Sequence, residues 1–195
     1  MQSKEFMRED LAYLGHPVLR KKALPVHRID HNIQELIRTL KHVVSLYRGL
    51  GLAAPQIGAQ VAIFIACFPE KNEEGTIVPG KPHVFINPKL TDPSEETWTE
   101  EEGCLSIPKF YRNVSRPVAI TITSQDETGT WNTERLSGWP AKIIMHENDH
   151  LNGVLFIDRL PTKEKRESHQ ELTELKKRYK QHNSHLPIWH TTEEP

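Results

Sequence analysis

The chain contains few cysteines and no long apolar run. Only two cysteines, Cys67 and Cys104, occur among its 195 residues, which excludes a scaffold built on disulfides. No hydrophobic stretch approaches the roughly 18–20 residues of a membrane span, and residues 1–10 contain no apolar region of the kind found in secretion signals. We therefore expect a cytoplasmic protein that has no membrane segment.

An excess of charge of one sign is also lacking. The 25 Lys and Arg residues against 26 Asp and Glu residues give a formal net charge of −1, which argues against the broad basic surface of a dedicated nucleic-acid-binding protein. There is no internal repeat and no long Gly/Ser linker, so we expect one domain over residues 1–195. The 11 histidines direct attention to metal binding.

Apolar periodicity predicts three helices. Residues 30–47 carry an apolar stripe at helical spacing, with Asp30 suited to the N-cap. Residues 140–152 begin with a proline and are followed by Gly153, which marks a helix with a sharp end. The charged residues 163–181 predict an exposed third helix near the C-terminus.

The middle of the chain has the character of β-structure. Residues 61–68 form a short apolar run rich in branched side chains, and residues 116–126 alternate apolar with polar side chains, as half-buried strands do. A turn joins the latter segment to residues 131–139, which predicts a hairpin. Residues 69–82 are polar and predict a loop. Helices that flank an antiparallel-rich middle indicate an α+β fold.

The 140–152 helix carries the string HENDH at residues 146–150, an HExxH pattern. Residues i and i+4 lie only about 40° apart around a helix axis, so both imidazoles face one side and can grip a divalent metal. Glu147 lies about 100° further round than His146, beside such a metal, where it can take a proton from a bound water. The alternative is a solvated helix with chance histidines. Neighbouring apolar residues instead indicate a buried helix, in which idle charged groups would be unfavourable.

Two histidines leave a third ligand to be found, because catalytic sites of this type generally use three protein ligands and one open position. Gly153 fits the longer metzincin pattern, but Phe156 stands where that pattern has its third histidine. Glutamates further on lie in the charged segment 163–181. The remaining candidate is Cys104, for which a papain-like nucleophile and a buried core residue are alternatives. The core interpretation suits Cys67, which has no polar neighbour.

The sequence GLGLAAPQIG at residues 49–58 is a third unusual feature. Its small residues fit a nucleotide-binding fingerprint on paper, but the segment follows a helix rather than opening one after a strand. A helix end and turn explain Gly49 but not the single amide of Gln56. Small residues let a substrate backbone lie close, and a buried amide can donate to a developing oxyanion.

Together, GLGLAAPQIG, EGCLSIP and HENDHLNG closely resemble, in order and separation, the three signature motifs of the peptide deformylase family. The resemblance covers nearly the whole chain. It implies that Cys104, His146 and His150 are the metal ligands, with water in the fourth place. It also implies that Glu147 is the catalytic glutamate, and the expected fold becomes α+β with antiparallel-rich mixed sheets around a central HExxH metal-binding helix.

The same resemblance implies the reaction and the surroundings of the substrate. The reaction is removal of formyl from the N-terminal formyl-methionine of new polypeptides, with Gln56 and the backbone N–H of Leu105 steadying the oxyanion. Leu50 and Gly51 match positions lining the substrate strand, and Gly103 is expected opposite them, on the strand that carries the cysteine. The metal is commonly Fe²⁺ in the cell, and Zn²⁺, Ni²⁺ or Co²⁺ can replace it.

Ile143 and Leu50 are our candidates for the walls of the methionine pocket. Three positions depart from the family pattern: Met145 replaces a glutamine, Asn148 replaces an apolar residue, and Tyr111 stands where an arginine is often found.

Several alternatives remain at this level. The main one is an HExxH zinc endopeptidase, and another is an inactive relative that binds partners. The basic residues within 163–181 could dock on a ribosome, or that segment could be a solvated helix, because glutamates are interleaved with them. We also expect Arg116 to pair with Asp149, which would fasten a strand to the metal-binding helix.

Overall fold

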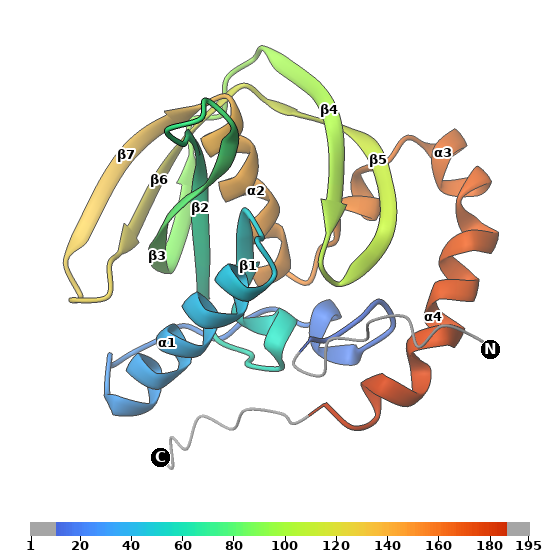
Figure 1. The fold of residues 1–195 in the computed structure, drawn as a ribbon, viewed down its shortest axis with the longest axis horizontal. Coiled ribbons are helices and arrows are strands. Elements are labelled where there is room, and N and C mark those ends of the chain that lie inside the picture. Colours follow the sequence, from blue (N-terminus) through green and yellow to red (C-terminus); the bar gives the residue numbers. More distant parts are fainter. Residues whose placement is uncertain (1–10, 187–195) are drawn as a thin grey trace.

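The computed structural model describes residues 11–186 (Figure 1). Residues 1–10, which carried the expectation about a secretion signal, and residues 187–195 lie outside the described part, as do both ends of the expected domain. The strands are β1 Gly51–Ala53, β2 Ile63–Lys71, β3 Ile77–Thr91, β4 Thr97–Cys104, β5 Ile107–Pro117, β6 Ala119–Gln125 and β7 Trp131–Ser137. The helices are α1 His31–Leu46, α2 Trp139–Leu151, α3 Thr162–Glu167 and α4 His169–Asn183, with 3-10 turns at Pro17–Arg20, Ala54–Ile57 and Phe156–Arg159.

The strands form two antiparallel sheets, one of five strands in the order β1-β2-β3-β6-β7 and one of two strands, β4-β5. Helix α2 lies between them (Figure 1). Its apolar side, including Ile144, packs with Phe64 and Ile122 of the larger sheet in one hydrophobic cluster. The expected α+β fold with a central helix is confirmed, and this position lets one helix present side chains to both sheets.

Helix α1 forms where the periodicity predicts it. The Asp30 side chain accepts a hydrogen bond from the Ile33 N–H at 3.0 Å, which satisfies one of the free donors at the helix start. Its buried stripe joins a second hydrophobic cluster, which also contains Cys67. Burial raises the pKa of the Cys67 thiol to about 11, with a smaller contribution from Glu147, so Cys67 is a core residue and not a nucleophile.

The loop expected over residues 69–82 is wrong. Strands β2 and β3 continue through most of it as a hairpin, with Lys71 paired to Ile77 and Pro69 to Pro79. At the turn, the Asn72 side-chain oxygen accepts hydrogen bonds from two backbone N–H groups, those of Glu74 and Thr76. Much of this hairpin is exposed, so no apolar alternation marks it, and backbone pairing sustains strands that the sequence pattern does not reveal.

The C-terminal segment also differs from the expectation of one continuous helix. It is split into α3 and α4 at Ser168, which is buried. Leu175 and Tyr179 are the buried residues of helix α4, and the Tyr179 ring stacks on Tyr13 at 4.3 Å between centroids. The Asn183 side chain also exchanges two hydrogen bonds with the Tyr13 backbone, at 3.0 and 3.1 Å. Apolar contacts and hydrogen bonds therefore attach the C-terminal helix to the N-terminal segment.

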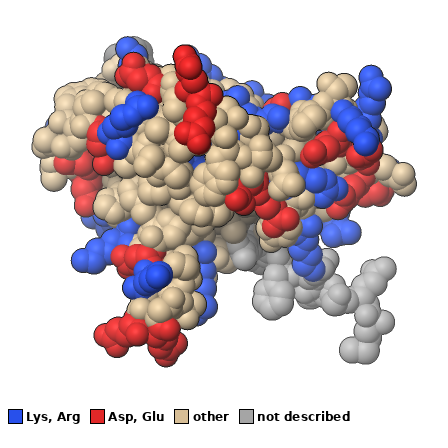
Figure 2. Space-filling model, turned by 90° about the horizontal axis from the view of Figure 1, so that it is seen from above, with Lys and Arg blue, Asp and Glu red and all other residues tan. Residues whose placement is uncertain are grey.

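The surface shows the charge balance of the composition. On the face drawn in Figure 2, basic and acidic side chains are interspersed and neither sign forms a continuous area. Within residues 11–186, no helix is long and apolar enough to cross a membrane.

Candidate metal centre

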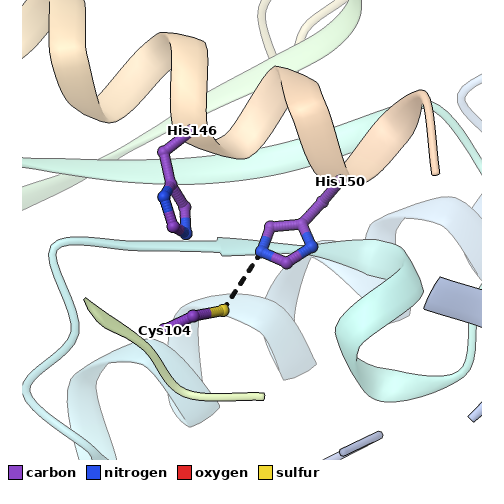
Figure 3. A group of neighbouring side chains, drawn as sticks. All are labelled: Cys104, His146 and His150. Atoms are coloured by element: carbon purple, nitrogen blue, oxygen red, sulfur yellow. Dashed lines mark hydrogen bonds between the residues drawn. The ribbon is translucent and has the colours of Figure 1, made fainter. Parts of the chain in front are cut away.

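Cys104, His146 and His150 converge beside the inner face of α2 (Figure 3). One ligand atom from each lies within 4.8 Å of the others, and Cys104 Sγ is 3.3 Å from His150 Nε2. The two histidines project from adjacent turns of one helix face, because i and i+4 nearly coincide around the axis, and Cys104 meets them from the end of β4. One thiolate and two imidazoles form a donor set that fits a divalent transition metal with one position open.

His146 is oriented by a buried carboxylate. Its Nδ1 lies 2.9 Å from Glu102 Oε2, which leaves Nε2 to face the centre. Burial alone would raise the pKa of Glu102, but hydrogen bonds with His146 and Arg116 outweigh it and lower that pKa to about 2. The sequence analysis did not single out Glu102. Glu102 and Cys104 line the same cavity, but the strand register shifts between them, so no regular alternation in the sequence marks Glu102.

The two histidines sit in opposite electrostatic environments. Burial, reinforced by the charge of His146, lowers the pKa of His150 well below its usual value. Burial would do the same to His146, but its hydrogen bonds with Cys104 and Glu102 raise its pKa well above that value. His150 is therefore neutral, which is the form that binds a metal, whereas metal binding at His146 is coupled to loss of a proton.

Arg116 ties α2 to the β4–β5 sheet, as the sequence analysis expected. Its Nη1 donates to Asp149 Oδ2 at 2.9 Å, and its Nε donates to Glu102 Oε1 at 2.6 Å. Arg159 also donates to Asp149, at 2.8 Å from its Nε. Arg116, Glu102 and Asp149 are all buried, so each charge is compensated by a partner from another element, and the metal-binding face of α2 is held in place.

Glu147 lies directly against the backbone of β1. A Cβ added to Gly51 would come within 2.3 Å of Glu147 Oε1, so only glycine leaves room for this carboxylate. Glu147 is buried, and burial raises its pKa to about 7. Its Oε2 has no hydrogen-bond partner within the described part of the chain. A carboxyl group poised near neutral pH, with one oxygen unengaged, is suited to proton transfer.

The Gln56 amide has a fixed orientation. Its Oε1 accepts from the Ala53 N–H at 2.8 Å, and its Nε2 donates to Ser106 Oγ at 3.2 Å. Nε2 also lies 3.5 Å from Cys104 Sγ. Because the backbone of β1 engages the oxygen, the NH₂ group faces the candidate metal centre, where it can donate to an oxyanion.

A cavity of about 540 Å³ opens onto these groups. It brings together nearly all the site residues predicted from the sequence; His150, which is buried, lies behind the lining. The predicted residues that line it are Leu50, Gly51, Gln56, Gly103, Cys104, Leu105, Ile143, His146 and Glu147.

Eight further residues that the sequence analysis did not assign to the cavity also line it: Gly49, Glu101, Glu102, Pro108, Lys109, Tyr111, Trp139 and Lys142. A Cβ on Gly103 would lie 2.5 Å from the Tyr111 ring. Glycine is therefore the only residue type at position 103 that leaves room for the Tyr111 ring over strand β4.

Comparisons of the sequence with known proteins all match one family. The sequence model of the family described as polypeptide deformylase matches residues 8–166. A peptide deformylase of Pseudothermotoga lettingae is 38% identical over 169 residues, which cover 87% of this chain and 92% of that protein. A peptide deformylase of Synechocystis is 40% identical over 152 residues, covering 77% of this chain and 78% of that protein.

Solved structures agree with the sequence matches. Peptide deformylase 1B of Arabidopsis thaliana, in complex with an inhibitor, superposes with a TM-score of 0.79 at 34% identity and covers 94% of this chain and 98% of its own. The Thermotoga maritima peptide deformylase gives a TM-score of 0.69 at 36% identity, with 77% and 96% covered. None of these matches supports the alternative of a zinc endopeptidase.

Proposed function

The chain belongs to the peptide deformylase family, and from this premise we propose which of its residues carry the reaction. It is a metal-dependent hydrolase that removes the formyl group from N-terminal formyl-methionine of newly made polypeptides. The observation that carries the assignment of roles is the convergence of Cys104, His146 and His150 beside the buried Glu147.

Cys104, His146 and His150 hold one divalent metal ion, which when bound polarises the formyl group and activates water. The ion in the cell is Fe²⁺, and Zn²⁺, Ni²⁺ or Co²⁺ can replace it, since a thiolate with two imidazoles suits all four. The supporting observations are the donor set within 4.8 Å and the Glu102 carboxylate that orients His146.

Glu147 is the proton carrier. It accepts a proton from the attacking water and returns it to the departing amine, so that formate and a free methionyl amine result. Gln56 Nε2–H and the Leu105 N–H donate to the oxygen that gains negative charge during attack on the formyl carbon. The fixed orientation of the Gln56 amide supports this role, because no reorganisation is needed during the reaction.

The formylated peptide lies along Leu50 and Gly51 on one side and Gly103 on the other. Ile143 and Leu50 form walls of the pocket for the methionine side chain. The support is that all four residues line one cavity with Glu147 and Cys104, and that the two glycines admit close neighbours that a Cβ would exclude.

The protein acts in the cytoplasm as one catalytic domain over residues 1–195. Support for one domain comes from the hydrophobic cluster that joins Leu11 and Tyr13 of the N-terminal segment with α1 and with Leu175 and Tyr179 of α4. The basic residues of α3 and α4 dock on the ribosome near the emerging chain. Salt-sensitive co-sedimentation with ribosomes, lost on truncation after Leu160, is the expected result, and salt-independent or unchanged co-sedimentation would contradict docking.

The assignment of roles is tested by formate release from a formyl-Met peptide, with protein purified anaerobically together with its metal. We expect Glu147→Ala to abolish release with the metal retained, and Cys104→Ala to lose both. Metal analysis of the freshly purified protein identifies the ion. Full activity in both variants would overturn the mechanism, and cleavage of unformylated peptides with metal retained in Cys104→Ala would favour an endopeptidase.

A further inference from the structure

One wall of the catalytic cavity carries a buried lysine. Lys142 follows Trp139 by three residues on α2, so both face the cavity, together with the adjacent Ile143. Lys142 is only 4% exposed. Its Nζ lies 5.3 Å from the ring centroid of Trp139 and 5.6 Å from that of Trp98, and the two indoles meet edge to face. The ammonium is therefore held against aromatic rings at the cavity wall.

The Lys142 ammonium has no hydrogen-bond acceptor within residues 11–186. The carboxylate nearest to it is Glu102, whose Oε1 is 4.0 Å away, and Glu102 is already engaged by Arg116 and His146. Burial lowers the pKa of Lys142, as expected of an amine removed from water. A buried donor without an acceptor is unfavourable. A ligand that brings an acceptor atom into the cavity would therefore be favoured, because it would give the Lys142 ammonium a hydrogen-bond partner.

We propose that Lys142 is a specificity-determining residue that donates a hydrogen bond to an acceptor atom on the first side chain of the formylated peptide. This rests on the proposed function, in which that side chain packs on Ile143, the neighbour of Lys142. The thioether of methionine is a weak acceptor, whereas the sulfoxide of oxidised methionine and the amide of glutamine each present a strong oxygen acceptor. The pocket thus accepts formyl-methionine sulfoxide and formyl-glutamine besides formyl-methionine, and it disfavours norleucine, which has no acceptor.

The test compares kcat/KM for three formyl tripeptides that differ only in the first residue: methionine, methionine sulfoxide and norleucine. In the unaltered enzyme we expect the sulfoxide to be favoured over norleucine. In Lys142→Met the ratio of sulfoxide to norleucine should fall by about tenfold to a hundredfold, which is the usual worth of one hydrogen bond to a charged group. Lys81→Met, which removes a charge from an exposed strand position, should keep the original ratio.

The ratio of the two kcat/KM values is measured within each preparation, so any inactive, misfolded fraction lowers both values equally and does not change the ratio. Lys142→Leu is a second apolar replacement, which decides the question if Lys142→Met does not fold. An unchanged ratio in the apolar variants, or equal use of norleucine and the sulfoxide by the unaltered enzyme, would overturn the inference while leaving deformylation intact. Failure of the unaltered, metal-loaded enzyme on formyl-methionine itself would instead count against the proposed function.

Discussion

Helices α2 and α4 are of similar length, 13 and 15 residues, and both carry many ionisable side chains. Their environments differ sharply. In α2 the buried residues include Lys142, Glu147, Asp149 and His150, whereas α4 buries only Leu175 and Tyr179. The chemistry of the molecule is concentrated on the helix whose charged groups are removed from water.

The partners of these charges also differ. Asp149 of α2 pairs with Arg116, 33 residues away, and His146 of α2 pairs with Glu102 of β4. In α4, Glu174 pairs with Lys177 only one turn further along, and both side chains are more than half exposed. Glu171 of α4 also pairs with Arg112 of β5, but these side chains are 51% and 34% exposed. Because buried charges need compensation, the α2 groups constrain how distant elements meet more strongly than the exposed pairs of α4 do. The predictions below test this contrast from the largest expected effect to the smallest.

Glu147→Gln should produce the largest change. The substitution keeps the shape and removes the proton-accepting carboxylate, so formate release should fall by about 10²–10⁴-fold, with metal content unchanged. The matched change on the other helix, Glu174→Gln, should leave the rate unaltered. Formate release and metal analysis on the same samples check this. A Glu147→Gln enzyme within a factor of three of the original rate would remove Glu147 from the mechanism.

Arg116→Met should cost about 3–5 kcal/mol in the free energy of unfolding, because it leaves the buried Glu102 without its main partner and takes one of two from Asp149. Arg116→Lys keeps the charge but not the forked geometry and should lose less. Urea denaturation of the metal-free proteins measures both. A loss below 1 kcal/mol for Arg116→Met would mean that the buried ion network does not hold α2.

The free energy of unfolding at acidic pH should depend on the ionisation of Glu102. Its pKa is lowered to about 2 in the folded protein from about 4.5 when unfolded, so its ionised form contributes stability that is present above about pH 4.5 and is lost as the pH falls towards 2. We expect the stability difference between the unaltered protein and Glu102→Gln to narrow over that window in metal-free samples. A difference that stays constant from pH 5 to pH 2 would contradict an ionised, hydrogen-bonded Glu102.

The contrast between the helices also explains which features of the fold and the site could be predicted from the sequence. The α1 and α2 spans, and the common face of His146 and His150, follow from local periodicity, which a sequence displays directly. The pairing of Arg116 with Asp149 was also anticipated and is present. Elimination left Cys104 as a candidate third ligand with two alternatives open, and only the resemblance of three motifs selected it, because no local pattern shows that β4 ends beside α2.

What was missed depends on long-range packing. The β2–β3 hairpin replaces an expected loop, because its exposed end has backbone pairing without apolar alternation. The sequence analysis assigned no role to Lys142, whose ammonium lies against the rings of Trp98 from β4 and Trp139 from α2. The C-terminal segment is divided at Ser168, where no neighbouring proline or glycine marks the break in the sequence. For the hairpin and for Lys142, the deciding partner lies elsewhere in the chain or in the backbone.

Leu175→Ala should test how α4 is attached. Leu175 is buried in the same cluster as Tyr13 and Tyr179, so its truncation should cost about 2 kcal/mol in the free energy of unfolding. Metal content should not change, because the centre is held by α2 and β4. Thermal denaturation with parallel metal analysis checks both. Loss of the metal in this variant would show that α4 supports the centre and would weaken the contrast.

Lys177→Met on α4 should have the smallest effect. Its partner Glu174 lies 3.0 Å away, with the two side chains 68% and 59% exposed, and such surface pairs contribute about 0.2–1 kcal/mol. We expect a change in the free energy of unfolding of no more than about 0.5 kcal/mol, diminished further by added salt. Arg116→Met removes a buried cation that is shared by Glu102 and by Asp149 of α2, whereas Lys177→Met removes an exposed cation from one pair within α4. Urea titrations of both variants measure the two losses in the free energy of unfolding. A loss for Arg116→Met that is several times larger than that for Lys177→Met would support burial as the difference between α2 and α4. Similar losses would contradict it.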